Sequence, residues 1–164
     1  MASGLFYSGP DLGTLHREYA ANGRLDDSAQ LNSSHSIVVA APVAKVWQLL
    51  VDVANWSSWY PGFQLKTLTE VTPGGTFEWT LGNGTIQSTF AVVAPGRELT
   101  WSGKAMWLKA VDRHVLEPVD ANTTRVTVAE SMSGVLIPLI YSTAKIQKVQ
   151  ETRLQALKAV AEGS

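Results

Sequence analysis

Apolar and polar positions follow two different periods along the chain, and each period predicts one kind of element. Apolar residues recur at helical spacing over 43–50, 53–60 and 136–161, which predicts two short helices and one long C-terminal helix. Ser34–Ala41 and the stretch 63–132 carry strand-like patterns, which predict one early strand followed by several more. This order indicates an α+β fold in which the long helix covers one face of an antiparallel sheet.

Four expected turns set the register of the predicted strands. They are Asn83-Gly84, Pro95-Gly96, Leu108-Lys109 and the loop Val119–Thr123. Asn-Gly is a strong hairpin signal, and Pro-Gly also marks a turn. The cross-strand pairs that these turns predict are Leu81–Ile86, Trp79–Ser88, Phe77–Phe90, Val92–Leu99, Phe90–Trp101, Ser88–Gly103, Trp107–Ala110, Ala105–Asp112, Gly103–His114, Trp101–Leu116, His114–Val128 and Asp112–Glu130.

This register gives the sheet one largely apolar inner face. Its apolar members are Phe77, Trp79, Leu81, Ile86, Phe90, Val92, Leu99, Trp101, Trp107, Leu116, Val126, Val128 and Met132. Four polar side chains lie among them on neighbouring strands, namely Ser88, Asp112, His114 and Glu130. Gly103, expected opposite His114, leaves space above the imidazole or marks a bend in its strand. We therefore expect the candidate chemistry on this inner face.

Asp112, His114 and Glu130 are the candidate catalytic residues. A carboxylate beside an imidazole orients the ring and raises its basicity, and an apolar surrounding raises the pKa of a carboxyl. The alternative is that these groups form an ion pair or fixed hydrogen bonds that anchor the strands or orient a ligand. Ser88 near His114 shows no nucleophile elbow or oxyanion hole, so a Ser-His-Asp triad is not expected.

The chain is rich in tryptophan, with six in 164 residues. The large aromatic side chains of the inner face are Phe77, Trp79, Phe90, Trp101 and Trp107. They form either a cage for a planar or polycyclic ligand or an ordinary core, because aromatic residues at alternate strand positions suit both. A ligand held there would also contact the small polar or glycine positions Ser88 and Gly103.

Two further aromatic groups lie outside the strands. Trp59 and Tyr60 precede Pro61-Gly62 and form either a gate at the mouth of a cavity or a partly exposed pair beside a buried Trp56. Tyr141, near the start of the long helix, reaches the cavity with its hydroxyl or satisfies a backbone group. These three residues complete the set of expected ligand contacts.

Composition excludes several classes of function. The net charge of −1 argues against nucleic-acid binding, and no apolar run approaches the roughly 18 residues of a membrane span. The chain contains no cysteine, and His16, His35 and His114 lack metal-ligand spacing, with His16 and His35 expected at the surface. No phosphate loop or dinucleotide fingerprint occurs, so we expect neither a metal nor a cofactor. The N-terminal sequence does not resemble a signal peptide, and we expect a cytoplasmic protein.

Residues 1–30 form an N-terminal extension before the domain, which we expect to cover 31–164. The extension is rich in glycine, serine and aspartate, and we expect it to be partly flexible. Asp11 can cap a short helix that carries Leu15 on its apolar side and ends near Gly23.

Four stretches of the chain resemble the START/Bet v 1-like superfamily, also called SRPBCC, which includes polyketide cyclase/dehydrase-like proteins. They are IVVAAPVAKVWQLLVDVANWSSWYPG (37–62), APGRELTWSG (94–103), LEP (116–118) and TRVTVAESMSG (124–134). The resemblance covers about 32–162 and implies a helix-grip fold: a curved, mainly seven-stranded antiparallel sheet around a long C-terminal helix, with a deep apolar cavity between them. Members carry hydrophobic ligands or cyclise, dehydrate or hydrolyse polyketide and related substrates. No catalytic residue is universal in this superfamily.

Two functions remain open on the sequence. The first is a cofactor-free enzyme that binds an apolar, cyclic or polyketide-like molecule and catalyses a cyclisation, dehydration or isomerisation. The second is a non-catalytic carrier or sensor of a hydrophobic ligand, in which the same polar groups recognise the ligand. A homodimer built through the N-terminal segment is a further option.

Overall fold

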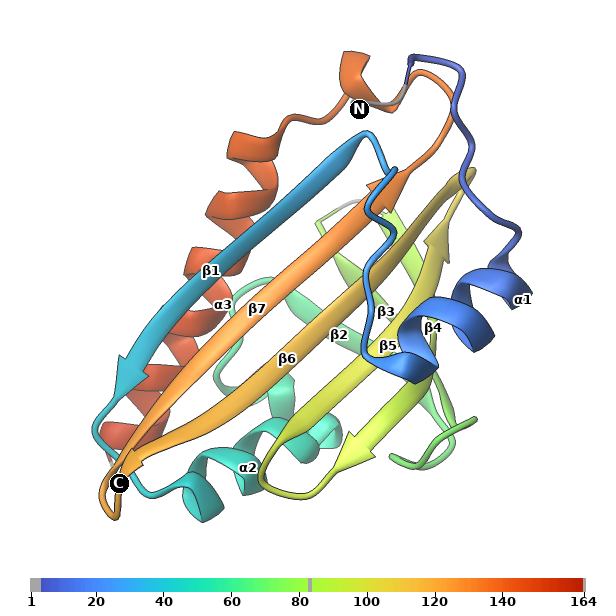
Figure 1. The fold of residues 1–164 in the computed structure, drawn as a ribbon. Helices are drawn as coiled ribbons and strands as arrows, with labels where there is room; N and C mark the ends of the chain where they lie inside the picture. The colour runs from blue at the N-terminus through green and yellow to red at the C-terminus, as the bar shows by residue number, and fades with distance from the viewer. Residues whose placement is uncertain (1–3, 83, 164) are drawn as a thin grey trace.

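One β-sheet and one long helix dominate the computed structural model, which describes residues 4–82 and 84–163 (Figure 1). The strands are β1 (Leu31–Val39), β2 (Phe63–Leu68), β3 (Thr76–Leu81), β4 (Gly84–Ala94), β5 (Glu98–Ala105), β6 (Leu108–Asp120) and β7 (Thr123–Ser133). The helical segments are α1 (Leu12–Thr14), η1 (Leu15–Tyr19), η2 (Ala20–Asn22), α2 (Val43–Val51), η3 (Val53–Ser58), η4 (Ile137–Leu139) and α3 (Thr143–Glu162).

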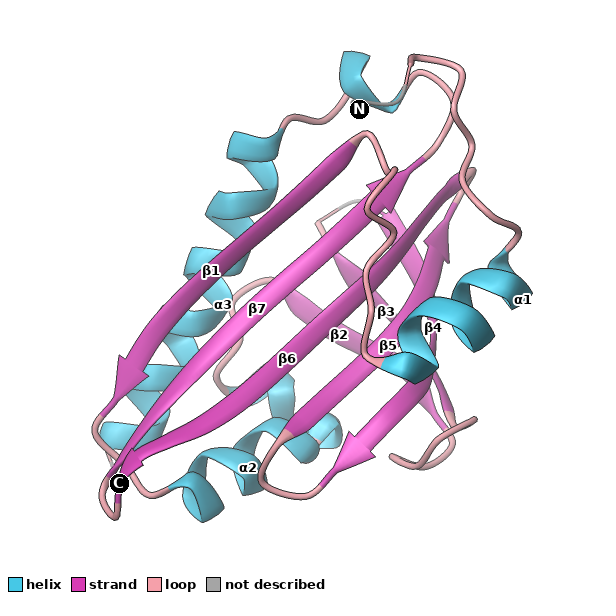
Figure 2. Cartoon of the chain, viewed as in Figure 1, coloured by secondary structure: helices cyan, strands magenta, loops and turns pink. Residues whose placement is uncertain are grey.

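The strands form an antiparallel sheet in the order β1-β7-β6-β5-β4-β3-β2 (Figure 2). Strands β2 to β7 follow one another as a meander, and β1 pairs with β7. Helix α3 lies along one face of the curved sheet, and the N-terminal helical turns lie on the other face (Figure 1). The structure therefore confirms the helix-grip architecture expected from the sequence.

Helix α3 is shorter than the apolar periodicity over 136–161 predicts. It begins at Thr143, where the side chain of Ser142 accepts a hydrogen bond from the backbone N–H of Lys145. Leu136 has a left-handed backbone (φ 66°), and Pro138 lies in the single 3-10 turn η4. Both features prevent a continuous helix from forming before Ser142.

The elements at the start of the domain agree with the sequence to within a few residues. The first strand occupies Leu31–Val39 rather than Ser34–Ala41, and α2 follows directly after Pro42. The second short helix, expected over Val53–Tyr60, is a 3-10 helix over Val53–Ser58.

Two of the four expected hairpins have the predicted register at the candidate site. Phe90 pairs with Trp101, and Ser88 pairs with Gly103, as the Pro95-Gly96 turn predicts. A bulge at Ala91 then shifts the strand, so that Leu99 pairs with Val93 rather than with Val92. The pairs His114–Val128 and Asp112–Glu130 are both present between β6 and β7.

The other two hairpins are shifted by an even number of residues. Leu81 pairs with Gly84 instead of Ile86; Gly82 (φ 73°) supplies a left-handed turn position, and Asn83 lies outside the described residues. Between β5 and β6 the turn lies at Met106-Trp107, not at Leu108-Lys109. Because side chains alternate with period two, both shifts keep nearly all side chains on their expected face.

The shifted β5–β6 turn makes all four pairs expected for this hairpin wrong, and Ala105 lies opposite Leu108 instead of Asp112. Gly103 lies opposite Ala110, not opposite His114, and Trp101 lies opposite Asp112 instead of Leu116. Trp107 belongs to the turn, and its side chain is 43% exposed instead of facing the inner side. Its indole N–H donates to the carbonyl of Val135 (2.8 Å), which holds the ring outside the sheet.

The N-terminal segment covers the outer face of the sheet. Asp11 caps α1, and Leu15 and Ala20 are buried against Ala91 and Val111. His16, which we expected at the surface, is half-buried, and its Nδ1 lies 2.7 Å from Oγ of Ser102. The N-terminal segment therefore covers the outer face over β4, β5 and β6, which buries the outward-facing Ser102.

Candidate functional site

A cavity of about 590 Å³ lies between the sheet and the N-terminal half of α3. Some of the expected site residues line it, namely Trp79, Ser88, Trp101, Gly103, Asp112, Glu130 and Tyr141. Others are absent from its lining: Trp59, Tyr60, Phe77, Phe90, Trp107 and His114. The expected ligand contacts are therefore divided between the cavity wall, the packed core and the surface.

Several of the expected aromatic contacts are buried and pack against one another in the core instead of lining the cavity. Phe77 stacks on Phe90 with ring centroids 4.6 Å apart, and both side chains are buried. Tyr60 is buried as well and stacks on Phe63, whereas Trp59 is half-buried. Tyr60 is thus a core residue in this structure rather than part of a partly exposed pair.

Arg153 of α3 organises the polar cluster at the inner end of the cavity. Its guanidinium Nη1 lies 2.9 Å from Oδ2 of Asp112, and both side chains are only 4% exposed. Its Nε donates to the hydroxyl of Tyr60 (3.1 Å), and its Nη1 lies 3.1 Å from Nε2 of His114. A buried ion pair needs such additional hydrogen bonds, because removing both charges from water is costly.

His114 lies behind the cavity wall and is fully buried. Its ring stacks on Trp101 at a centroid distance of 4.7 Å. Burial lowers the pKa of His114 to about 4, so the ring is neutral at pH 7. Because a guanidinium only donates hydrogen bonds, Nε2 must accept from Arg153, which assigns the ring proton to Nδ1. His114 therefore acts here as an acceptor for Arg153.

Asp112 and Glu130 occupy directly paired positions on β6 and β7, and both line the cavity. Burial alone raises the pKa of a carboxyl, but the Arg153 guanidinium outweighs it and holds the pKa of Asp112 below its usual value. Burial, together with the negative charge of Asp112, raises the pKa of Glu130 well above its usual value. The environment therefore favours the ionised form of Asp112 and the protonated form of Glu130.

One atom of the pair has no protein partner. Among residues 4–82 and 84–163, no group donates a hydrogen bond to Oδ1 of Asp112 in this structure, although the atom is buried. Nδ1 of His114 is 3.7 Å away, which is too long for a hydrogen bond. A side-chain hydrogen bond links Glu130 to Asp112, so Glu130 donates to a ligand only by exchanging that bond, whereas Oδ1 of Asp112 remains available as an acceptor.

Gly103 and Ser88 shape the wall opposite this pair. Ser88 Oγ accepts a hydrogen bond from the indole of Trp79 (3.1 Å). A Cβ atom on Gly103 would lie 2.9 Å from Ser88 Oγ and 3.1 Å from the backbone carbonyl of Gln87. Glycine is therefore needed at position 103 for the close approach of β4, not for space above the imidazole.

The sequence reasoning missed Arg153. The residue lies within the buried stripe of α3 that also contains Ile146, Gln150, Leu154 and Leu157. A charged residue at a core position of a helix is rarely buried without a partner of opposite charge. The predicted inner face of the sheet contains two carboxyls and no arginine or lysine, so a carboxyl there is the expected partner. Reading these two features together identifies the ion pair.

The described part of the chain contains neither a cluster of metal ligands nor a helix that could span a membrane. No three His, Asp, Glu or Cys side chains among these residues are grouped as a metal site would require. No helix in the same residues is long and apolar enough to cross a membrane.

Comparison with solved structures places the fold among known proteins. A START superfamily protein from Mycobacterium smegmatis superposes with a TM-score of 0.67 at 15% identity, covering 80% of this chain and 97% of that chain. The Zhui aromatase/cyclase from Streptomyces sp. R1128 gives 0.65 at 16% identity, covering 80% and 93%. A hypothetical protein from Helicobacter pylori gives 0.71 at 18% identity, covering 82% and 90%. These identities are low, so the similarities concern the fold.

A search of the curated proteins found no match. The family model described as "polyketide cyclase / dehydrase and lipid transport" matches residues 30–162, which include every strand, α3 and the whole Asp112–Glu130–Arg153 cluster. The chain therefore belongs to the polyketide cyclase / dehydrase and lipid transport family.

Proposed function

We propose that this protein binds an apolar, cyclic or polyketide-like small molecule in the cavity and transforms it without a cofactor, by acid–base chemistry between Asp112 and Glu130. The observation that carries the proposal is the direct pairing of these two carboxyls on the wall of a cavity of about 590 Å³. A volume of this size accommodates a small molecule of several fused rings.

The two carboxyls have different roles in the proposed chemistry. Glu130 is protonated and supplies a proton or a hydrogen bond to an oxygen of the ligand, while Oδ1 of Asp112 is ionised and accepts a proton. Environments that push the pKa values of neighbouring groups apart are typical of acid–base assignments. Arg153 acts as a positioning residue, since its guanidinium is engaged by Asp112, Tyr60 and His114.

A dehydration shows how the two carboxyls would act together in one reaction. Asp112 removes the α-proton of a β-hydroxy ketone, the carbon–hydroxyl bond breaks, and Glu130 protonates the departing hydroxyl to give water and a conjugated enone. A cyclisation by aldol addition uses the same two roles, with Asp112 forming the enolate and Glu130 protonating the new alkoxide. The apolar wall holds the chain folded, which brings the reacting carbons together.

A non-catalytic carrier is the second candidate, and the commitment of Arg153 to internal partners favours it. Its Nε and Nη1 hydrogen-bond Tyr60, Asp112 and His114, so a ligand in the cavity meets Arg153, Asp112 and Glu130 as a fixed set of polar groups. In a carrier, the protonated Glu130 donates to a carbonyl or hydroxyl oxygen of the ligand and no bond is broken.

Variants of Glu130 separate the two candidates. We expect a panel of aryl β-hydroxy ketones to displace the neutral fluorescent probe N-phenyl-1-naphthylamine, and the best binder to gain enone absorbance with the wild-type protein. Glu130→Gln keeps probe binding but lowers turnover about 100-fold or more, the typical contribution of a general acid. Ketones that displace the probe yet give no enone with the wild-type protein would contradict the enzyme and leave the carrier.

A further inference from the structure

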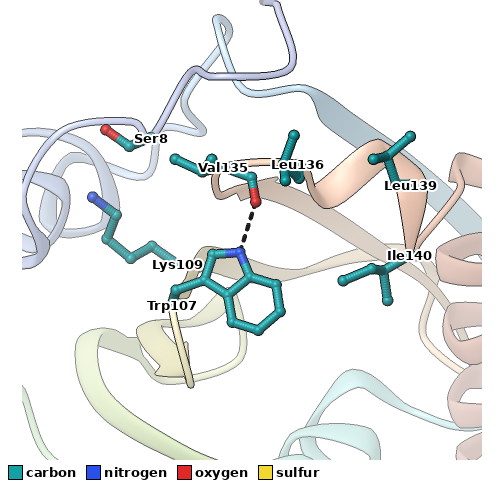
Figure 3. A pocket seen from close by; sticks show the side chains of 7 residues that line it. All are labelled: Ser8, Trp107, Lys109, Val135, Leu136, Leu139 and Ile140. Atoms are coloured by element: carbon teal, nitrogen blue, oxygen red, sulfur yellow. Dashed lines mark hydrogen bonds between the residues drawn. The ribbon is translucent and has the colours of Figure 1, made fainter.

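Six large apolar side chains project from two loops at the open end of the sheet. They come from the β5–β6 turn and the segment before α3, and we call them the apolar rim: Met106, Trp107, Val135, Leu136, Leu139 and Ile140. Figure 3 shows the segment Val135–Ile140 arranged around the indole of Trp107. Met106 is 78% exposed and Leu139 70% exposed, which is unusual for apolar residues clustered in one place.

The backbone at the rim is held in a costly conformation. Met106 (φ 56°) and Leu136 (φ 66°) are left-handed although neither is glycine, and among the described residues no other non-glycine residue has a positive φ. Bulky residues rarely adopt this region, and such strain persists where the surroundings enforce it. The hydrogen bond from Trp107 to Val135 ties the two loops together, so the rim is a fixed surface.

The charge around the rim is positive. Lys104 and Lys109 form the second cross-strand pair from the β5–β6 turn. Lys109 donates to the carbonyl of Pro10, and Lys145 donates to the carbonyl of Ile140 (3.1 Å). The segments 104–110 and 134–145 contain these three lysines and no aspartate or glutamate. The whole chain has a net charge of −1, so this basic character is local.

The rim borders the mouth of the cavity. Lys104, Leu108, Tyr141 and Lys145 all line the cavity, and they lie one to a few residues from the rim in the sequence. A molecule bound to the apolar rim would therefore lie beside the cavity entrance.

We propose that the apolar rim docks onto an anionic phospholipid bilayer, with its side chains among the lipid headgroups and the exposed Lys104 and Lys145 on the phosphates. Exposed aliphatic side chains with a tryptophan and a basic surround are the combination that membrane interfaces bind. A second copy of the chain fits less well, because a two-fold contact centred on the rim brings the two sets of lysines together. Docking places the cavity mouth at the bilayer, so an apolar molecule enters without crossing water.

Vesicle sedimentation of the full chain tests this proposal independently of the proposed chemistry. We expect binding to vesicles of phosphatidylcholine with phosphatidylserine, and binding about tenfold weaker or more to phosphatidylcholine alone. The variant Lys104→Gln/Lys145→Gln weakens binding about fivefold per lysine. Met106→Asn/Leu139→Ser weakens it about tenfold or more, and asparagine tolerates the left-handed backbone at 106.

Matched controls come from the opposite end of the sheet. Val119 is 51% exposed and Arg125 is exposed, and neither Val119→Ser nor Arg125→Gln should change vesicle binding. The absence of sedimentation with either vesicle overturns the proposal, as does an equal effect of the control variants. A rim variant that converts a dimer to a monomer in analytical ultracentrifugation, without any vesicle binding by the wild type, assigns the rim to a second copy and also overturns it.

Discussion

Arg153 on α3 and Asp112 on β6 form a buried ion pair with a 2.9 Å contact across the inner end of the cavity. The pair connects the long helix to the middle of the sheet, and it sets the charge state of the whole cluster. Beside the ionised Asp112 and the protonated Arg153, burial favours the protonated form of Glu130 and the neutral form of His114. Both preferences reduce the charge buried in the cluster, which lowers the cost of removing it from water.

Breaking the ion pair from one side should destabilise the fold strongly. Arg153→Met leaves the Asp112 carboxylate buried without its cation, and we expect the free energy of unfolding to fall by about 3–5 kcal/mol. Urea denaturation at pH 7 measures this loss. The double variant Arg153→Met/Asp112→Leu should recover much of it, because no unpaired charge remains; the exposed control Arg125→Ala should change stability by less than about 0.5 kcal/mol. An Arg153→Met protein as stable as the control contradicts the structure.

The raised pKa of Glu130 makes a specific prediction for alkaline conditions. A carboxyl whose folded-state pKa lies above its usual 4.5 stabilises the fold below that value, and this contribution is lost as the pH rises through the folded-state pKa. Glu130→Gln cannot ionise, so its stability relative to the wild type should increase from pH 5 to pH 8. Denaturant unfolding of both proteins across this range is the measurement. Parallel curves at every pH would show that Glu130 titrates normally.

His114 should destabilise the folded protein on acidification. Its folded-state pKa of about 4 lies below the usual histidine pKa of 6.5, so between these values the unfolded chain binds a proton that the folded chain does not. Stability attributable to His114 is therefore full above pH 6.5 and declines toward pH 4, by up to about 3 kcal/mol. His114→Gln should lack this part of the pH dependence. Long-range ¹H–¹⁵N spectra should show a neutral Nδ1–H ring at pH 6, and an imidazolium at that pH would contradict the assignment.

The close approach of β4 and β5 at Gly103 can be tested with the smallest possible addition. Gly103→Ala places a Cβ against Ser88 Oγ and the carbonyl of Gln87, and we expect a loss of about 1–3 kcal/mol in the free energy of unfolding. Adding Ser88→Ala should restore only part of it, because the backbone carbonyl remains in place. An unchanged midpoint for Gly103→Ala would mean that the strands separate easily here.

The sequence was sufficient for the fold and for the faces of the strands. Period-two alternation tolerates errors of two or four residues in a turn, which is why Trp79, Asp112 and Glu130 were assigned to the correct face despite wrong turns at two hairpins. The Asp112–Glu130 pair was predicted correctly, because the expected loop Val119–Thr123 gives the observed register of β6 and β7 at these residues.

The remaining features depend on contacts between distant parts of the chain. Nothing local to Trp107 indicates that its indole will bond Val135 and leave the sheet, and the start of α3 depends on the strained Leu136 and the cap at Ser142. The contact between His114 and Arg153 could not be predicted for the same reason, since Arg153 is 39 residues away on a different element.

Native mass spectrometry of the freshly purified protein tests the central claim, that the cavity is a small-molecule site, most directly. The comparison variant is Ala110→Trp, which places a large side chain at a position that lines the cavity. We predict that the wild type carries an added mass, released on denaturation as an apolar small molecule, and that Ala110→Trp carries none. The same added mass on both proteins, or no added mass on either, would contradict the assignment of this cavity as the binding site.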